Sequence, residues 1–389
     1  MKAFSLIARI LDHIRKDGFF WTLRQSFRAS GLKRMLHNPG KLSRDGYVFD
    51  DDTLYAYYDL NVNPMTFDAA WFCACAEMER RNRGLSHLAL FIVPADNKDV
   101  REESLEYDAA VDRDRRLWRL YNVVISSMLM FKPEASVHVL RDLGDLRLFA
   151  LKPKHVYPEG YSPFVFPKPI TYQDFAKLNR QLSVIGLESF YRGEQAGGLY
   201  ISAWRAHIGA KARLVVITLR QYPFATDRNA NLDAWLEFAR GLDPEKYTVA
   251  FVPDTDMAYS ENSGRIELEF AVYREAAFHP QLRAALYESA FLNMGTLSGP
   301  MNMAIFNRNC RYMLFKPLVP SAAMSTEKVL TEIGFTVGEN LGYMTPYQKL
   351  VWEPDDLEVL RREFAKFEAL AAEHDLPDSP VRASSGGLP

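Results

Sequence analysis

Residues 213–254, RLVVITLRQYPFATDRNANLDAWLEFARGLDPEKYTVAFVPD, decide the fold class. The stretch opens with a continuous apolar run at 213–219 and closes with another at 247–252, as buried strands do. Between these runs, residues 232–243 carry apolar side chains at helical spacing. Two strands joined by a helix form a βαβ unit, so the sequence predicts a parallel pair of strands.

Both halves of the chain repeat this alternation. The N-terminal half predicts strands at 53–60, 87–94 and 136–140, with a helix at 69–84 after the first. The C-terminal half continues with a helix at 280–291, a strand at 292–298, a helix that begins within 299–307 and a closing strand at 311–315. We therefore expect an α/β protein with two Rossmann-like domains that face each other across a cleft.

A proline-rich stretch at 152–174 predicts the crossing between the two domains. The expected parts of the chain are a basic amphipathic helical arm at 1–45, an N-terminal Rossmann-like domain at 46–175, a C-terminal Rossmann-like domain at 176–345, a C-terminal helix at 346–375 that returns to the first domain, and a disordered tail at 376–389.

Charge and composition exclude several classes of protein. The formal net charge is −2, which does not indicate a nucleic-acid partner. Cys73, Cys75 and Cys310 form no CxxC pair, so neither a disulfide framework nor a zinc site is expected and a cytoplasmic location fits best. The longest apolar runs are also too short to span a membrane.

The N-terminus is the one strongly basic part of the chain. Residues 1–44 hold ten Lys or Arg against two Asp, a net charge of +8, with apolar residues at helical spacing. Two interpretations remain open: a helical arm packed on its own domain, and a helix that lies on an anionic membrane surface. The second would make the protein peripheral on the inner membrane.

Polar residues follow the predicted strands of the C-terminal half at their carboxyl ends. Ligands bind outside these ends in open parallel sheets. Arg220, Arg228 and Asn229 follow the first of these strands, and Asp254 follows the second. Arginine forks suit a diphosphate, so we expect Arg220, Arg228 and Asn229 to hold one and Asp254 to contact the nucleotide or the sugar. An ion pair between Arg220 and Asp254 is the structural alternative.

The segment SGPMN, at 298–302, follows the third strand of this half. Ser298, Gly299 and Asn302 would complete the diphosphate site, because Gly299 lets the backbone approach a ligand and amides are free where a helix begins. A turn that merely starts a helix needs the same residue types. Similarly, Asn229 and Asn231 could simply cap the helix at 232–243.

The first strand of the N-terminal half ends in a comparable cluster. A carboxylate here could accept the proton of an acceptor hydroxyl, with Asp59 as the first candidate and Asp68 as the second. Asn61, Asn63 and Arg101 are candidates for acceptor binding. The structural alternatives are an Asx-turn followed by a helix N-cap for the Asp–Asn cluster, and a solvated charged loop for Arg101.

Common cofactor and catalytic motifs are missing. The sequence has no GxGxxG, GxxxxGK[ST] or GxSxG motif and no metal-ligand pair, so no cofactor and no metal are expected. The Asp-x-Asp at 254–256 is matched equally well by chance at 50–52 and 112–114.

Two Rossmann-like halves, a proline-rich crossing and a C-terminal helix resemble the GT-B architecture of glycosyltransferases. VVITLRQYPFATDRN at 215–229 is similar to the strand and arginine loop with which the fucosyltransferase-like branch holds the diphosphate of GDP-fucose. LNMGTLSGPMNMAIFN at 292–307 resembles the strand, turn and helix at the donor pocket of that branch. The resemblance implies that Arg220 binds the diphosphate and that the donor is GDP-linked. Leu219 and Gln221 flank Arg220 where that branch usually has His or a further Arg.

The chain also resembles a family of bacterial proteins associated with surface polysaccharide synthesis, in stretches such as YYDLNVNPMTFD at 57–68 and WRLYN at 118–122. Together the resemblances imply a metal-independent glycosyltransferase that moves a sugar from a nucleoside-diphosphate sugar to a glycan or lipid-linked acceptor. They also imply that the domain at 176–345 is the nucleotide-sugar domain and the domain at 46–175 the acceptor domain. A catalytically silent glycan-binding or scaffold protein of the same fold and a nucleotide-sugar epimerase or hydrolase are the alternatives.

Overall fold

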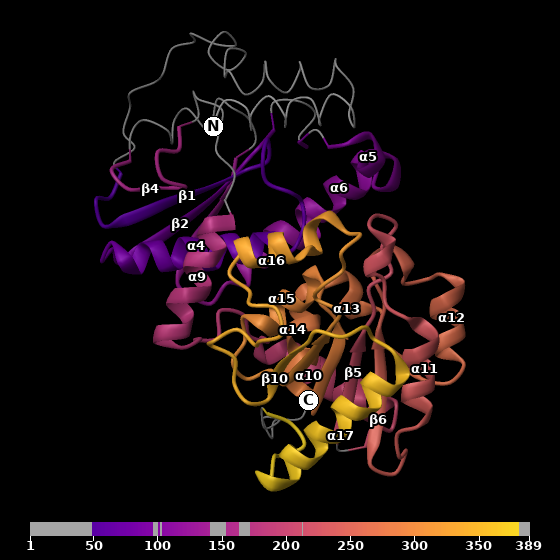
Figure 1. Ribbon diagram of the computed structural model, residues 1–389. Helices are drawn as coiled ribbons and strands as arrows, with labels where there is room; N and C mark the ends of the chain where they lie inside the picture. The colour runs from indigo at the N-terminus through magenta and orange to yellow at the C-terminus, as the bar shows by residue number, and fades with distance from the viewer. Residues whose placement is uncertain are drawn as a thin grey trace. The chain divides into compact units, whose positions relative to one another are not determined.

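A computed structural model describes residues 49–95, 100–101, 103–140, 153–162, 172–211 and 213–380. The basic arm expected at 1–45 and residues 381–389 of the tail lie outside the described residues. The chain divides into two compact units (Figure 1). Unit 1 comprises Met1–Met65, Ala76–Arg119 and Glu134–Ile170, and unit 2 comprises Thr66–Cys75, Leu120–Pro133 and Thr171–Pro389.

Unit 1 contains a parallel sheet whose strand order is β3-β2-β1-β4. Its strands are β1 (Thr53–Asp59), β2 (His87–Val93), β3 (Ala135–Val139) and β4 (Val156–Tyr157). Every residue of β1 is buried, as expected for a strand of a parallel sheet that is covered on both faces. Tyr55, Tyr57 and Phe91 form the core beside β1 and β2. The helices in or entering unit 1 are α4 (Asp68–Asn82), α5 (Leu105–Ala110) and α6 (Arg113–Arg119).

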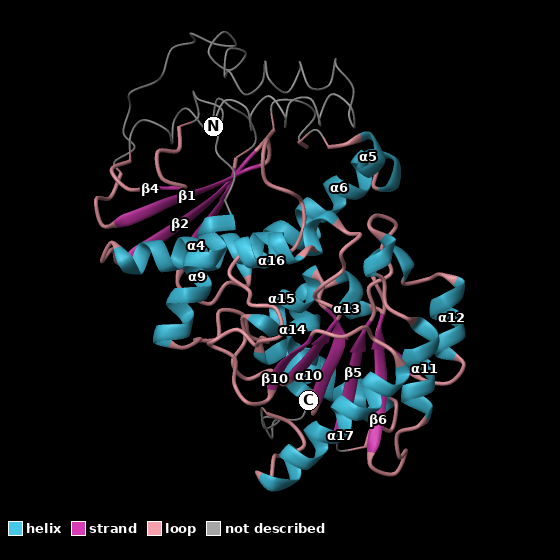
Figure 2. Cartoon of the chain, in the orientation of Figure 1, coloured by secondary structure: helices cyan, strands magenta, loops and turns pink. Residues whose placement is uncertain are grey.

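Unit 2 contains a second sheet of parallel strands (Figure 2). Its strand order is β10-β9-β8-β5-β6-β7. Its strands are β5 (Arg213–Thr218), β6 (Tyr247–Val252), β7 (Ala271–Val272), β8 (Leu292–Thr296), β9 (Tyr312–Phe315) and β10 (Gln348–Val351). The chain builds β5, β6 and β7 in one direction and then returns to add β8 on the other side of β5. The order therefore reverses between β5 and β8, and open parallel sheets bind their ligands at such a switch point, outside the carboxyl ends of the strands.

Helices cover both faces of this sheet. Val215 and Ile217 of β5 pack in one core with Trp235 of α11 (Leu232–Arg240) and Phe364 of α17 (Leu357–Glu373). Thr218 has the opposite orientation because side chains alternate along a strand. Its hydroxyl contacts Tyr287 of α14 (Pro280–Ser289), so α14 covers the other face.

The remaining helices of unit 2 are connections and covering elements. They are η1 (Leu120–Ile125, a π-helix), α7 (Ser126–Leu129), α9 (Tyr172–Ile185), α10 (Gln195–His207), η2 (Thr226–Arg228), η3 (Thr255–Met257), α12 (Glu261–Glu267), α13 (Glu275–Phe278), η4 (Gly299–Met301), α15 (Asn302–Ile305), η5 (Ala323–Ser325) and α16 (Glu327–Glu332). Among the described residues, no helix is both long enough and apolar enough to cross a membrane.

The expected α/β class with two parallel sheets is confirmed, and three details differ from the expectation. The strand expected to close the second sheet, β9, has β10 beside it, in a part of the chain at 346–375 for which we expected only a loop and a helix. The helix α17 packs on the core of unit 2, because Phe364 and Phe367 face that sheet; we expected it to return to the first domain. Residues 66–75 and 120–133 also belong to unit 2, although the sequence placed them in the first domain.

Candidate functional site

The loop after β5 holds the Arg220 side chain in place through neutral groups. Nη1 donates to the carbonyl oxygen of Ala225 at 3.0 Å and to Oδ1 of Asn229, and Nη2 donates to the carbonyl oxygen of Phe224 at 2.9 Å. Ala225 has a φ of 52°, in the left-handed region that non-glycine residues seldom adopt. The loop thus accepts local strain where it turns its carbonyl groups toward the guanidinium.

Arg220 is buried and Arg228 is partly buried, and the described residues give neither cation an ion pair. Burial, and after it the charge of Arg228, lowers the pKa of Arg220 to about 10, while Asp254 acts weakly in the other direction. Burial also lowers the pKa of Arg228, against the opposing effect of Asp68, and its Nη2 donates to the carbonyl oxygen of Leu297 at 3.2 Å. Among the described residues, no carboxylate lies within ion-pair distance of either guanidinium. The ion pair between Arg220 and Asp254 that we considered as an alternative does not form.

The two asparagines of this loop have structural contacts. Asn229 Oδ1 also accepts from the Tyr222 amide at 3.0 Å, and its Nδ2 donates to the Tyr222 carbonyl at 3.1 Å. Asn229 therefore orients Arg220 and closes the loop. Asn231 caps α11 by accepting from the Ala234 amide at 3.3 Å, as its capping alternative predicted.

Asp254, expected to contact the nucleotide or sugar, lies at the carboxyl end of β6. Its Oδ1 accepts from the Thr255 amide at 2.8 Å and its Oδ2 accepts from the Gln221 amide at 3.3 Å. The carboxylate thereby ties the loop after β6 to the residue that follows Arg220. Asp254 is partly exposed, and the sequence expectation for it stays a prediction.

The third polar group lies at the end of β8, on the other side of the switch point. Thr296 Oγ1 and Ser298 Oγ are buried and have no hydrogen-bond partner among the described residues, and the same holds for Gln221 Oε1. Buried polar atoms without a partner are uncommon in native folds and indicate a missing water or ligand. The expected helix is a 3-10 turn, η4, followed by the four-residue α15, so it is too short to supply a helix dipole.

The start of α4 belongs to unit 2 and contacts this polar group. The Asn302 side chain donates to the carbonyl oxygen of Phe67 at 3.1 Å, and a Cβ added to Gly299 would lie 3.2 Å from Phe67 Cβ. Gly299 and Asn302, which we expected to contact the diphosphate, thus also pack against Phe67 at the start of α4. Asp68, the second carboxylate candidate, is exposed. Its negative charge partly offsets the lowering of the Arg228 pKa by burial.

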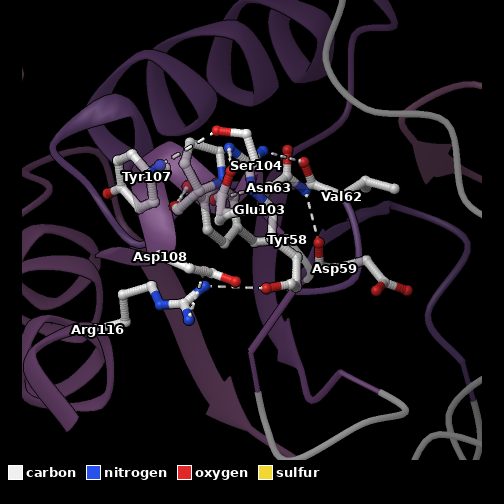
Figure 3. A network of polar contacts seen from close by, with 11 residues as sticks. Tyr58, Asp59, Val62, Asn63, Glu103, Ser104, Tyr107, Asp108 and Arg116 are labelled. Carbon is white, nitrogen blue, oxygen red and sulfur yellow. Dashed lines mark hydrogen bonds and ion pairs between the residues drawn. The ribbon is translucent and has the colours of Figure 1, made fainter. Parts of the chain in front are cut away.

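Asp59, the first carboxylate candidate, lies at the end of β1 in unit 1 and is almost fully buried. Its Oδ1 accepts from the backbone amide and from the side chain of Asn61, each at 2.9 Å, and its Oδ2 accepts from the Tyr161 hydroxyl at 2.8 Å. Asn63 donates to the carbonyl oxygen of Asp59 at 3.1 Å (Figure 3). This is the Asx-turn that the structural alternative predicted.

The Arg101 loop lies beside this turn, and its charges pair with each other. Arg101 binds both carboxylate oxygens of Glu103 and donates to the carbonyl oxygen of Val62 at 2.7 Å. Arg116 pairs with Asp108 at 2.9 Å and donates to the Arg101 carbonyl at 3.2 Å (Figure 3). The cations of this region are thus neutralised by acids of the same unit.

Sequence reasoning missed some polar groups at the carboxyl edge of unit 2. Lys316 directly follows β9, has a φ of 56°, and donates from Nζ to the carbonyl oxygen of Asn229 at 3.2 Å. Its position after a predicted strand was a usable signal. No signal marked Thr296 or Gln221, because a lone Thr or Gln beside a strand is usually structural.

Comparisons with known proteins give only distant likenesses. No protein-family model matches the sequence, and no curated protein matches it. Among solved structures, the chain is similar to a family 9 glycosyl transferase from Veillonella parvula, with a TM-score of 0.46 and 11% identity over 84% of this chain and 100% of that chain. The E. coli ADP-heptose lps heptosyltransferase II has a TM-score of 0.32 and 13% identity, over 83% and 77%. The wall teichoic acid polymerase TagF has 0.31 and 12%, over 95% and 92%. Because these TM-scores lie below 0.5, they add nothing to the contacts described above.

Proposed function

We propose that the protein is a glycosyltransferase that binds the diphosphate of a nucleoside-diphosphate sugar at the carboxyl edge of unit 2. The observation that carries this proposal is the pair of a buried Arg220 and a partly buried Arg228, whose guanidiniums are held by carbonyl and amide groups beside a switch point. Desolvated cations without an anion are costly in a fold, and a diphosphate would supply the missing charge. The unpartnered Ser298 hydroxyl would donate to the same ligand.

The positive charges of Arg220 and Arg228 would assist the bond changes of the transfer step. The bond between the anomeric carbon and the diphosphate oxygen breaks, and the acceptor oxygen forms a new bond to that carbon. Negative charge builds up on the leaving diphosphate, where Arg220 and Arg228 would stabilise it in place of a metal ion.

In an inverting reaction, a carboxylate takes the proton of the acceptor hydroxyl. Asp68 is the better candidate for this role, because its carboxylate is exposed and its charge acts on Arg228 within one unit. Asp59 accepts three hydrogen bonds inside unit 1 and is better suited to holding the loop after β1.

The finer assignments stay proposals of the same kind. Binding of a glycan or a lipid-linked acceptor of bacterial surface polysaccharide by unit 1 through Asn61, Asn63 and Arg101 stays a prediction from the sequence, because these side chains already have contacts within unit 1. A GDP-linked donor follows only from the resemblance in sequence. Attachment of residues 1–44 to an anionic inner-membrane surface would suit a lipid-linked acceptor.

Binding of nucleotides to Arg220→Met tests the proposal. Wild-type protein is titrated calorimetrically with GDP, UDP, CDP, ADP and dTDP in the presence of EDTA. We expect one of them to bind, and Arg220→Met to weaken it about 30-fold or more, since losing a buried charge-assisted contact costs about 2 to 5 kcal/mol.

Arg213→Met is the matched control. Arg213 lies at the opposite end of β5 and pairs with Asp378 at 2.9 Å, so this variant should bind the nucleotide like the wild type. Equal weakening in both variants would indicate a general loss of folding. If no nucleotide binds the wild type, the proposal fails and the silent scaffold becomes the better interpretation.

A further inference from the structure

One further buried arginine, Arg283, lies outside the contacts discussed so far. Arg283 of α14 is 1% exposed, and its Nη1 donates to the hydroxyl of Tyr287 at 2.9 Å. The guanidinium carbon lies 5.9 Å from the centre of the Tyr287 ring. No acid among the described residues lies within ion-pair distance of Arg283. Within the described part of the chain, the Arg283 guanidinium thus contacts the hydroxyl and the ring of Tyr287.

Arg283 lies next to the switch point of the sheet. The Tyr287 hydroxyl that it contacts is 2.8 Å from Oγ1 of Thr218, the last residue of β5. Gly295 of β8 is the register partner of Thr218, and a Cβ added to it would lie 2.5 Å from the Thr218 carbonyl oxygen. The hydrogen-bonded chain from Arg283 through Tyr287 to Thr218 therefore ends at the carboxyl edge of β5.

This arginine lies on the sheet face that α14 covers. Val215 and Ile217 point to the other face, where α11 and α17 pack, while Thr218 and Tyr287 define the face of Arg283. Arg220 lies two residues beyond Thr218, in the loop that continues from the strand. Arg283 and Arg220 therefore approach the same strand end from different elements.

The energetics argue against a purely structural role. A guanidinium has five N–H donors, and burying it without an acid costs more than burying an apolar side chain of similar volume. Replacing such a charge by a well-packed hydrophobic residue is often neutral or stabilising for a fold. A helix whose neighbouring residues Ala284, Ala285 and Leu286 are buried apolar side chains could hold methionine at this position.

We propose that Arg283 binds an oxyanion at the carboxyl edge of β5, in a subsite separate from the arginine pair Arg220 and Arg228. On the proposed function, which this inference extends, the oxyanion belongs to the bound donor: a phosphate group or a carboxylate of the transferred sugar. Tyr287 and Thr218 position the guanidinium. A planar fork with unused donors fits either oxyanion in bidentate fashion.

Inorganic phosphate, titrated calorimetrically into the full-length protein, tests the subsite. The titration uses Arg220→Met as the parent, because the diphosphate site proposed above is weakened there. We expect this parent to bind phosphate, and the double variant Arg220→Met with Arg283→Met to bind it at least tenfold more weakly. A parent that does not bind phosphate, or a smaller difference between the two proteins, would overturn the inference.

Two further measurements keep the result interpretable. If Arg283→Met does not fold, Arg283→Lys replaces it, and unchanged phosphate binding in that variant would refute bidentate recognition. The melting temperature without ligand separates the two roles: Arg283→Met should match or exceed the wild type when the charge is kept for a ligand, and a purely structural arginine would lower it.

A comparison of two sugar donors shows which group of the ligand supplies the oxyanion. UDP-glucose and UDP-glucuronate differ by the carboxylate at C6, so a preference for the second that disappears in Arg283→Met assigns the subsite to a sugar carboxylate. Equal effects of Arg283→Met on both donors assign it to a phosphate. Because the phosphate titration needs no nucleotide, it stays decisive even if no nucleotide binds and the proposed function fails.

Discussion

The carboxyl ends of β1 and β5 are the same kind of place in two parallel sheets, yet their charges are treated differently. After β1, Asp59 accepts hydrogen bonds from Asn61 and Tyr161, and beside this turn, in the segment after β2, Arg101 binds Glu103. After β5, Arg220 donates to carbonyl and amide oxygens and lies over the Tyr222 ring, and no carboxylate among the described residues pairs with it. The guanidinium of the first region is paired with a carboxylate, and the guanidinium of the second region is held by neutral groups.

This difference teaches how to separate a supporting loop from a binding loop. A charge that is paired within its own unit stabilises the loop that carries it. A charge that is oriented by neutral groups and deprived of water retains its attraction for an anion. The amino-acid types in the two loops are similar, so composition alone does not distinguish them.

The largest expected effect is on the rate of sugar transfer, and it compares the two carboxylate candidates Asp68 and Asp59. Asp68→Asn should lower the rate of sugar transfer about 10² to 10⁴-fold, because it removes the proposed proton acceptor and leaves a side chain of the same shape. Asp59→Asn should change the rate per folded molecule little. The measurement is single-turnover transfer with the donor found in the nucleotide titrations. A greater loss in Asp59→Asn would reverse the roles of the two regions.

The second effect concerns stability of the paired region. Asp59→Ala leaves the Tyr161 hydroxyl and the Asn61 side chain without their acceptor, so the free energy of unfolding of unit 1 should fall by about 2 to 4 kcal/mol. Urea denaturation followed through tryptophan and tyrosine fluorescence measures it. Tyr161→Phe, which removes one of the three hydrogen bonds, serves as the milder control. A neutral Asp59→Ala would mean that the turn does not need its carboxylate.

A paired acid in unit 2 sharpens the comparison, because it lies away from the carboxyl edge. Burial opposes ionisation of Glu363, but hydrogen bonds from Lys349, Lys366 and Arg362 outweigh it and lower its pKa to about 2. The unfolded value is higher, near 4.5, so the stabilisation is complete above that pH and is lost as the pH falls toward 2.

The expected loss over that pH interval is about 2 to 3 kcal/mol, from the rule of roughly 1.4 kcal/mol per pKa unit. Thermal unfolding of wild type and Glu363→Gln between pH 7 and pH 2.5 measures it. The variant should show a shallower dependence on pH, and two parallel curves would count against a stabilising role of this cluster.

The smallest expected effect probes strain in the binding loop. Ala225→Gly removes the left-handed conformation penalty of Ala225, whose carbonyl accepts from Arg220, so the folded state should gain about 0.5 to 1 kcal/mol. Nucleotide affinity should stay the same or fall slightly, because the freer loop orients Arg220 less well. A loss of stability would show that the alanine methyl group packs usefully.

Local patterns predicted much of this molecule. The βαβ alternation gave the two parallel sheets, the carboxyl-end rule led to Arg220, and the residue type of Asn231 predicted its cap. What could not be predicted depends on long-range contacts. Tyr161 is 102 positions from Asp59 and settles the environment of that carboxylate. Arg283 lies within the amphipathic pattern of a helix, where nothing in the sequence shows that the side chain is buried without an acid.

The unpaired arginines of unit 2 also bear on the lifetime of the chain in a cell. On the proposed function, a ligand that binds only the native state holds the protein folded in proportion to its own supply. Depletion of the donor would then enlarge the unfolded fraction that proteases degrade. The abundance of the protein would follow the availability of its substrate without any dedicated regulator.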